Sequence, residues 1–265
     1  MKKLILVLSV AFLSTAAMAA DGIKIISKTK NLANGAVSST DIFMTDSNIV
    51  LNNKGNGDNS SFIFDATKQE FMYVDHSKRE YYHFDRAAMA KLKQQIQMLM
   101  MMMKQFAANM PPEQKKKLDK ILNKNESNVD FKYSGSQTKI GKWSAKKYVS
   151  TADGQKASDL YIASFSTLGY SKSQFQVMDK LIAYFKTNLS EIAAFLPSGG
   201  SFSQIGLDDS SPVFKEGVPV KTVSYTNGKA ANENLVESIS KTSINSDMFG
   251  APSGYTKKEL KMEMN

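Results

Sequence analysis

The chain has 265 residues, a formal net charge of +9 and no cysteine. Its hydrophobic content of 42% and charged content of 22% exclude a wholly disordered or collagen-like chain. The absence of cysteine excludes a disulfide scaffold, an iron–sulfur cluster and a cysteine nucleophile. Among the 34 basic residues only Arg79 and Arg86 are arginine, the residue that nucleic-acid readers favour. We therefore expect no nucleic-acid partner, and a lysine surface that is either simply solvated or weakly attracted to anionic membranes.

Residues 1–19 have the layout of a secretory signal peptide. Lys2-Lys3 precedes an apolar run from Leu4 to Leu13, and Ala17-Met18-Ala19 places small residues where a signal peptidase reads them. The run is too short for a membrane-spanning helix, which needs roughly 18 residues. We expect cleavage after Ala19 and one domain, residues 20–265, that is periplasmic or secreted.

The first part of this domain is predicted to be β-structure. Apolar clusters between Ile23 and Leu51 predict two strands and the start of a third, with Asn34-Gly35 as a hairpin turn. The polar stretch from Asn52 to Ser61 is predicted to be a turn. Short apolar-aromatic runs then predict a three-stranded antiparallel meander over residues 62–65, 70–75 and 80–85.

A long helix is predicted from Arg86 to Asn109, with Asp85 as its N-cap. Its apolar residues alternate at spacings of three and four and so form one stripe: Met89, Leu92, Ile96, Leu99, Met103, Phe106 and Met110. Further methionines make part of this helix apolar nearly all round: Met98, Met100, Met101 and Met102. Such a helix is buried or faces a non-aqueous ligand.

The remaining pattern alternates between helix and strand. Pro111-Pro112 is expected to end the long helix and to start a lysine-rich one that reaches about Leu122. Residues 123–130 are predicted to be a polar linker, followed by strands over 131–136, 139–151 and 157–165. A helix is predicted next, from Ser171 or Ser173 to about Leu196. The last predicted elements are a hairpin of 218–226 and 235–244 around Asn227-Gly228 and a tail from Asp247.

Catalytic signatures are missing from the sequence. It contains no nucleophile elbow, phosphate loop, dinucleotide fingerprint or metalloprotease motif. His76 and His83 belong to one predicted hairpin and would need a third ligand to hold a metal; a turn histidine and a half-buried strand histidine are favoured instead. Asp208-Asp209 has no obvious partner. We therefore expect no enzyme activity, no cofactor and no metal.

The methionine cluster allows three interpretations. It is a core helix filled with an adaptable side chain, an apolar surface that repacks around lipid tails or a partner helix, or a Cu(I) site. Copper is disfavoured because Met100 to Met103 are consecutive and point around the helix at about 100° steps. Only Met98 with Met101 or Met102, and Met100 with Met103, share a face.

Several local patterns together resemble a family of uncharacterised exported bacterial proteins. The patterns are Phe62-Ile63-Phe64-Asp65, Phe71-Met72-Tyr73-Val74-Asp75 and Lys78-Arg79-Glu80-Tyr81-Tyr82, then Lys139-Ile140-Gly141-Lys142-Trp143 with Lys146-Lys147-Tyr148, and finally Asp247-Met248-Phe249, Pro252 and Gly254-Tyr255. In fold this family resembles the outer-membrane lipoprotein carriers (LolA/LolB-like), which hold acyl chains between a curved sheet and its helices. The resemblance implies such a fold, but no receptor motif of the carriers is matched.

We predict one α+β domain, a curved antiparallel sheet or incomplete β-barrel with helices over its concave face. The leading hypothesis is non-catalytic binding of a lipid-like ligand, because a curved sheet and an apolar helix can hold an acyl chain without a polar motif. The predicted lining is Phe71, Tyr73, Tyr82 and Phe84 from the sheet, with Ile96, Leu99, Met100, Met103 and Phe106 from the helix. The rival hypothesis is a structural or interaction protein of the envelope whose Met-rich helix docks a protein partner; an envelope hydrolase is a third.

Overall fold

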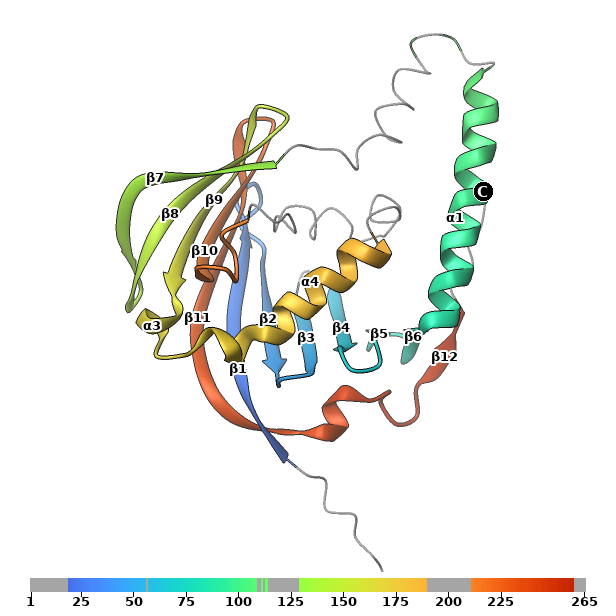
Figure 1. The fold of residues 1–265 in the computed structure, drawn as a ribbon, viewed down its shortest axis with the longest axis horizontal. Coiled ribbons are helices and arrows are strands. Elements are labelled where there is room, and N and C mark those ends of the chain that lie inside the picture. Colours follow the sequence, from blue (N-terminus) through green and yellow to red (C-terminus); the bar gives the residue numbers. More distant parts are fainter. Residues whose placement is uncertain are drawn as a thin grey trace, which may run out of the picture.

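The computed structural model describes residues 19–55, 57–108, 111, 113, 129–189 and 211–259 (Figure 1). Several predicted features lie outside these residues. They are the signal peptide up to residue 18, Met110, the lysine-rich second helix, most of the 123–130 linker, the end of the 171–196 helix, and Asp208-Asp209.

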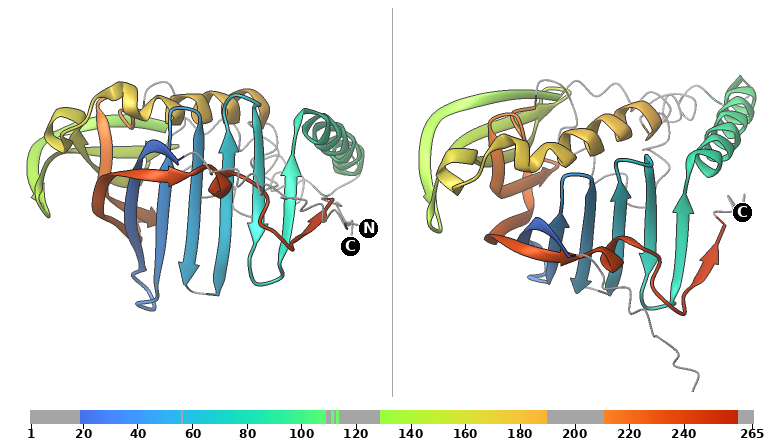
Figure 2. Two further views of the ribbon diagram at one scale, coloured as in Figure 1. Left: turned by 90° about the horizontal axis from the view of Figure 1, so that it is seen from below. Right: turned by 60° about the horizontal axis from the view of Figure 1, so that its bottom comes forward.

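All strands of the described residues belong to one sheet that curls without closing, so the chain is an α+β protein with an incomplete barrel (Figures 1 and 2). The spatial order is β12-β6-β5-β4-β3-β2-β1-β11-β10-β9-β8-β7, antiparallel throughout except for the β12–β6 pair. The bounds are β1 (Ala19–Asn31), β2 (Val37–Met44), β3 (Asn48–Gly55), β4 (Asp58–Asp65), β5 (Glu70–Asp75), β6 (Glu80–Phe84), β7 (Val129–Ile140), β8 (Trp143–Ala152), β9 (Gln155–Ser164), β10 (Gly217–Thr226), β11 (Lys229–Asn245) and β12 (Thr256–Lys258).

The predicted meander is confirmed, and several predicted boundaries are wrong; β11, for example, begins at Lys229 rather than at Leu235. β4, β5 and β6 pair antiparallel in sequence order. The stretch 52–61, predicted as a turn, is mostly strand, because its polar residues continue β3 and β4 and pair Asn53 with Ser60. The stretch 139–151, predicted as one strand, is broken at Gly141, whose φ of 54° suits a tight turn between β7 and β8.

Two longer helices flank the sheet. α1 (Arg86–Ala108) follows β6 directly, and its Asp85 cap is confirmed by a 2.8 Å hydrogen bond that the Ala88 N–H donates to Oδ1 of Asp85. α4 (Gln176–Leu189) lies across the concave face of the sheet, whereas the far half of α1 extends beyond the sheet edge (Figures 1 and 2). Two short helical turns were not predicted, α3 (Phe165–Leu168) and η4 (Ser246–Phe249), whereas η2 (Lys172–Phe175) forms the start of the helix predicted from Ser171 or Ser173.

Each face of the sheet carries its own core. The larger core lies on the concave face, where α4 contributes Leu181, Tyr184 and Phe185. A smaller core on the convex face consists of Val50, Ile63 and Val74, covered by side chains of the C-terminal segment: Met248, Phe249 and Tyr255. The predicted tail is therefore a strap that crosses the convex face and ends as β12 beside β6 (Figure 2).

Candidate functional site

The concave face of β1 to β6 is organised in rows of residues that pair across the strands. The lower row is apolar and fully buried: Ile23, Met44, Ile49, Phe64, Phe71 and Phe84. The rings of Phe71 and Phe84 stack at 4.2 Å, and Tyr184 of α4 lies 5.3 Å from Phe64. Burial first, and the charge of Glu70 second, raise the pKa of Tyr184 to about 12. This row is a closed core under α4.

The middle row lies two residues further along each strand and is only partly covered. Its members are Ile25, Ile42, Leu51, Phe62, Tyr73 and Tyr82. Ile25 is buried, whereas Tyr73 near the β6 edge is 40% exposed, and its ring lies 6.3 Å from that of Tyr82. Exposure along this row is therefore highest at Tyr73 of β5, while Tyr82 of β6 is half-buried.

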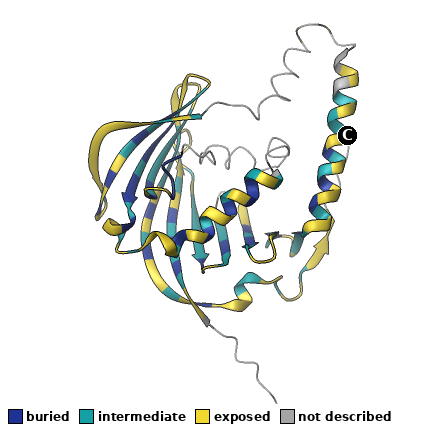
Figure 3. Cartoon of the chain, in the orientation of Figure 1, coloured by how far each residue is buried: buried dark blue, intermediate teal, exposed yellow. Residues whose placement is uncertain are grey.

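Along α1 the same apolar stripe changes from buried to exposed. Met89, Leu92 and Ile96 are buried in the concave core. Leu99, Met100 and Met103 are half-buried, and Phe106 is 65% exposed. Figure 3 shows buried positions, in dark blue, on the part of α1 near the sheet and intermediate and exposed positions toward its far end. On the opposite side of the helix, Met98 and Met101 are 55% and 63% exposed. The apolar surface of α1 therefore continues beyond the sheet that buries its first turns.

The predicted lining residues thus separate into three groups. Phe71, Phe84 and Ile96 belong to the closed core. Half-buried positions are Tyr82, Leu99, Met100 and Met103, while Tyr73 and Phe106 are exposed. α4 links the sheet residues of this set to its α1 residues. Lys93 of α1 donates a 3.3 Å hydrogen bond to the backbone carbonyl of Thr187, near the C-terminal end of α4. A ligand could touch the second and third groups without disrupting the core.

An upper row of polar residues was not predicted. It continues the same face with Ser27, Thr40, Asn53, Ser60, Asp75 and Glu80. The alternation Ile23, Ile25, Ser27 along β1 contains the signal, since residues two apart share a face. The polarity of the stretch 52–61 predicts a turn rather than two strands. The row therefore cannot be recognised from the sequence of this stretch.

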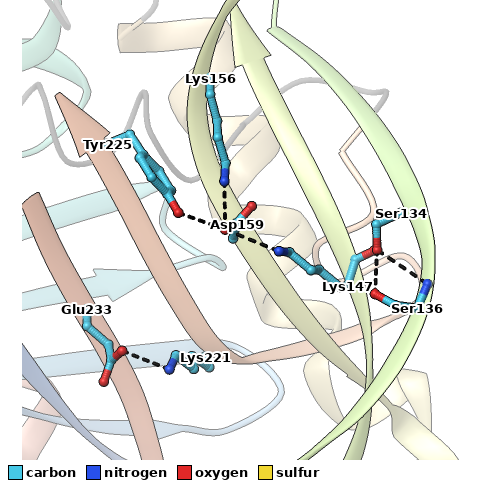
Figure 4. A network of polar contacts seen from close by, with 8 residues as sticks. All are labelled: Ser134, Ser136, Lys147, Lys156, Asp159, Lys221, Tyr225 and Glu233. Atoms are coloured by element: carbon cyan, nitrogen blue, oxygen red, sulfur yellow. Dashed lines mark hydrogen bonds and ion pairs between the residues drawn. The ribbon is translucent and has the colours of Figure 1, made fainter. Parts of the chain in front are cut away.

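A cluster of charged side chains lies on the convex face. Asp159 of β9 is buried there, on the side opposite to Leu160, and its Oδ2 accepts hydrogen bonds of 2.9 Å from both Lys156 and Tyr225 (Figure 4). Lys147 adds an ion pair at 3.4 Å. Burial by itself raises the pKa of the Asp159 carboxyl, but the bonds from Lys156 and Tyr225 and the charge of Lys147 outweigh it, so this pKa lies below its usual value.

The two histidines have separate partners. The Nε2 atom of His76 lies 2.6 Å from Oγ of Ser61, and its Nδ1 lies 3.1 Å from the hydroxyl of Tyr255 in the C-terminal strap. His83 contacts Glu70 at 3.1 Å. Within the described part of the chain, no group of three or more histidine, aspartate or glutamate side chains could hold a metal ion. His76 therefore fixes the strap to the convex face.

The chain was compared with known proteins. No family model and no curated protein matches it. An uncharacterized conserved protein from Thermus thermophilus, known from its crystal structure, aligns over 92% of this chain and 91% of its own, with 8% identity and a TM-score of 0.45. PNGF-II aligns over 91% of this chain but only 31% of its own, with 12% identity and a TM-score of 0.38. At these scores neither similarity identifies a family or a function.

Among the described residues, the helices range from four residues in α3 to 23 residues in α1. None of those in the described ranges combines the length and the hydropathy that a bilayer-spanning helix requires.

Proposed function

We propose that this chain binds a lipid-like, apolar or amphiphilic ligand and catalyses no reaction. The observation that carries this proposal is that two apolar surfaces, the middle row and the stripe of α1, each start in the core, at Ile25 and Ile96, and end exposed, at Tyr73 and Phe106. A closed core alone does not need exposed aromatic side chains on β5 and at the far end of α1. Burying an acyl chain yields about 0.8 kcal/mol per methylene, so such a surface is sufficient for binding.

The proposal is tested by measuring what the protein holds. The full chain is purified without detergent, examined by native mass spectrometry and extracted with organic solvent. A co-purifying lipid, or saturable uptake of a fluorescent fatty acid by the stripped protein, is the expected result. An unliganded mass together with no uptake would overturn the proposal.

The exposed aromatic residues give a sharper test. Replacing Tyr73 and Phe106 together by serine is expected to weaken fatty-acid uptake about tenfold or more, since each change removes one to a few kcal/mol of apolar contact, roughly 1.5–3 kcal/mol for a fully buried ring. Tyr133→Ser is the matched control, because Tyr133 of β7 is 44% exposed but lies at the opposite edge of the sheet. Equal uptake by both variants would place the ligand elsewhere.

A second candidate function is docking of a protein partner on α1. The exposed Met98 and Met101 favour it, because they lie on the side of the helix away from the core stripe. Thioether side chains adapt to partners of different shape. Partner capture that is lost in a Met98→Ser, Met101→Ser variant, with fatty-acid uptake absent from the wild-type chain, would favour this function over ligand binding.

We also propose that the protein is exported to the periplasm or secreted, as a member of the exported family whose motifs it resembles. The predicted cleavage after Ala19 is compatible with the fold, because it removes a single residue of β1. Mass spectrometry of the protein recovered from an envelope fraction is expected to give Ala20 as its first residue. Recovery of the intact N-terminus from the cytosol would contradict export.

A further inference from the structure

We infer that the ligand is an amphiphile with an uncharged, hydroxyl-rich head group, such as a sugar or polyol, which binds the polar row of the concave face. This inference rests on the proposed function and specifies its ligand class. It starts from the upper row, in which Thr40 and Asn53 are half-buried and Ser27 and Ser60 are buried, and which lies next to the partly covered middle row. Two residues along a strand correspond to about 7 Å, so a head group on the upper row is contiguous with a tail on the middle row.

The polar row extends around the curved sheet as a continuous belt. Ser27 pairs with Thr40, Thr40 with Asn53, and Asn53 with Ser60. On the other side of β1 the belt continues through cross-strand partners of the same face: Thr29, Asn234, Thr222, Asn232 and Ser224, ending at the buried pair Ser158 and Ser150. We call these serine, threonine and asparagine residues the hydroxyl–amide belt.

The belt offers both donors and acceptors. Thr40 donates a 2.9 Å hydrogen bond to Oδ1 of Asn53, and Nδ2 of Asn234 donates one of 2.9 Å to Thr29. Among the described residues, these contacts leave the Asn53 amide nitrogen as a donor and the Asn234 amide oxygen as an acceptor. Sugar and polyol hydroxyl groups both donate and accept, and so they match a mixed surface of this kind.

The charge distribution opposes an anionic head group. No residue of the lower, middle and upper rows of β1 to β6 is basic. The acidic residues that end the upper row are already paired, Asp75 with Lys78 and Glu80 with Lys258. Other lysines form ion pairs on the convex face, as Lys28 does with Glu237 and Lys221 with Glu233. Between Ser27 and Ser60, where the row has no charged residue, a phosphate or carboxylate would lose hydration without gaining a counter-charge from the row.

The experiment compares three twelve-carbon probes that differ in the head group: dodecyl maltoside, dodecanoate and dodecyl phosphate. Each probe displaces a fluorescent fatty acid from the full chain below its micellar concentration. We expect dodecyl maltoside to bind about tenfold more tightly than either anion, since one or two neutral hydrogen bonds correspond to this factor.

A matched pair of variants locates the head group. Thr40→Val with Asn53→Leu removes both partners of one hydrogen bond and leaves neither unpaired. This double variant is expected to lower maltoside affinity about tenfold and to leave dodecanoate affinity unchanged. Ser39→Ala, next to Thr40 on the convex face, is the control. Ser224→Ala, which removes a half-buried belt hydroxyl, replaces the double variant if that variant fails to fold.

Each outcome decides the inference. Tighter binding of the maltoside, lost selectively in the belt variant, supports it. Equal affinity for all three probes, or an equal loss for all three in the variant, overturns the head-group assignment and leaves lipid binding intact. Failure of every dodecyl probe to bind overturns both this inference and the proposed function.

Discussion

At the scale of single residues, Asp159 shows how a buried charge is accommodated in the half of the sheet that lies away from α1. Its side chain is 6% exposed and has Lys147 and Lys156 as charged partners. Its Oδ1 atom is buried without a hydrogen-bond partner among the described residues. The carboxylate therefore contacts these partners through Oδ2. The contribution of Asp159 to stability depends on the carboxylate staying ionised.

Replacing Asp159 by asparagine is expected to lower the free energy of unfolding at pH 7 by about 2 kcal/mol, the usual worth of hydrogen bonds to a charged group. Because the folded-state pKa of Asp159 is depressed, this contribution is complete above the unfolded pKa of about 3.9 and is lost as the pH falls through the folded value. Urea unfolding of both proteins from pH 7 to pH 2.5 should show the difference shrink below about pH 4. Asp130→Asn, at an exposed site on β7, is the control, and a difference that does not change with pH would contradict the assignment.

At the scale of elements, α1 has a structural role in its first turns, and the binding role is one that we propose for its later turns. Its first turns are buried in the concave core through Met89, Leu92 and Ile96, and its later turns are not. Ile96→Ala is expected to lower the free energy of unfolding by about 3 kcal/mol, as for other buried large-to-small changes. Met98→Ala, two residues away, should change it by less than about 0.5 kcal/mol. Chemical denaturation measures both values, and equal losses would mean that the outer side of α1 is covered in solution.

The strands and helices differ in how well the sequence predicts them. The meander of β4 to β6 was predictable because alternating aromatic residues and four-residue turns are local signals, and the Asp85 cap was predictable for the same reason. β12 was not, because Thr256-Lys257-Lys258 has no apolar pattern and forms a strand only through its pairing with β6. The exposure of Phe106 was not predictable either. It depends on where the sheet ends beneath the helix, whereas the periodicity of the stripe is identical in its buried and exposed parts.

The sequence predicted some of the residues of the candidate site but not how far the site extends. The aromatic residues of the meander and the apolar stripe of α1 were identified from their spacing. The hydroxyl–amide belt was missed because serine, threonine and asparagine in a row across strands are far apart in sequence, as Ser27 and Asn234 are. Such a row can be recognised only when strand order and register are known. Its assignment to a head group is our proposal and rests on the proposed lipid binding.

At the scale of the whole molecule, the sheet joins the two ends of the described chain. β1 pairs with β11 from Ala19 opposite Asn245 to Asn31 opposite Asn232. This pairing places the strand-rich N-terminal half beside β10 to β7 in one sheet, and the chain then returns under the convex face as the strap. The sheet therefore has a core on each face: a helix covers the core on the concave face, and the strap covers the core on the convex face.

The strap leads to a prediction about the solution behaviour of the whole protein. Replacing Phe249 and Tyr255 by serine uncovers the convex core, in which Val50 and Val74 are 2% and 0% exposed. The expected loss of unfolding free energy is about 3 kcal/mol, in the range for removal of aromatic side chains from a packed site. Because uncovered apolar surface promotes association, light scattering coupled to size exclusion should show larger species that increase with protein concentration. Leu235→Ser, on an exposed side chain of β11, is the control. A variant that stays monomeric and as stable as the wild-type chain would mean that the strap does not protect the sheet, and the convex core would then need another cover.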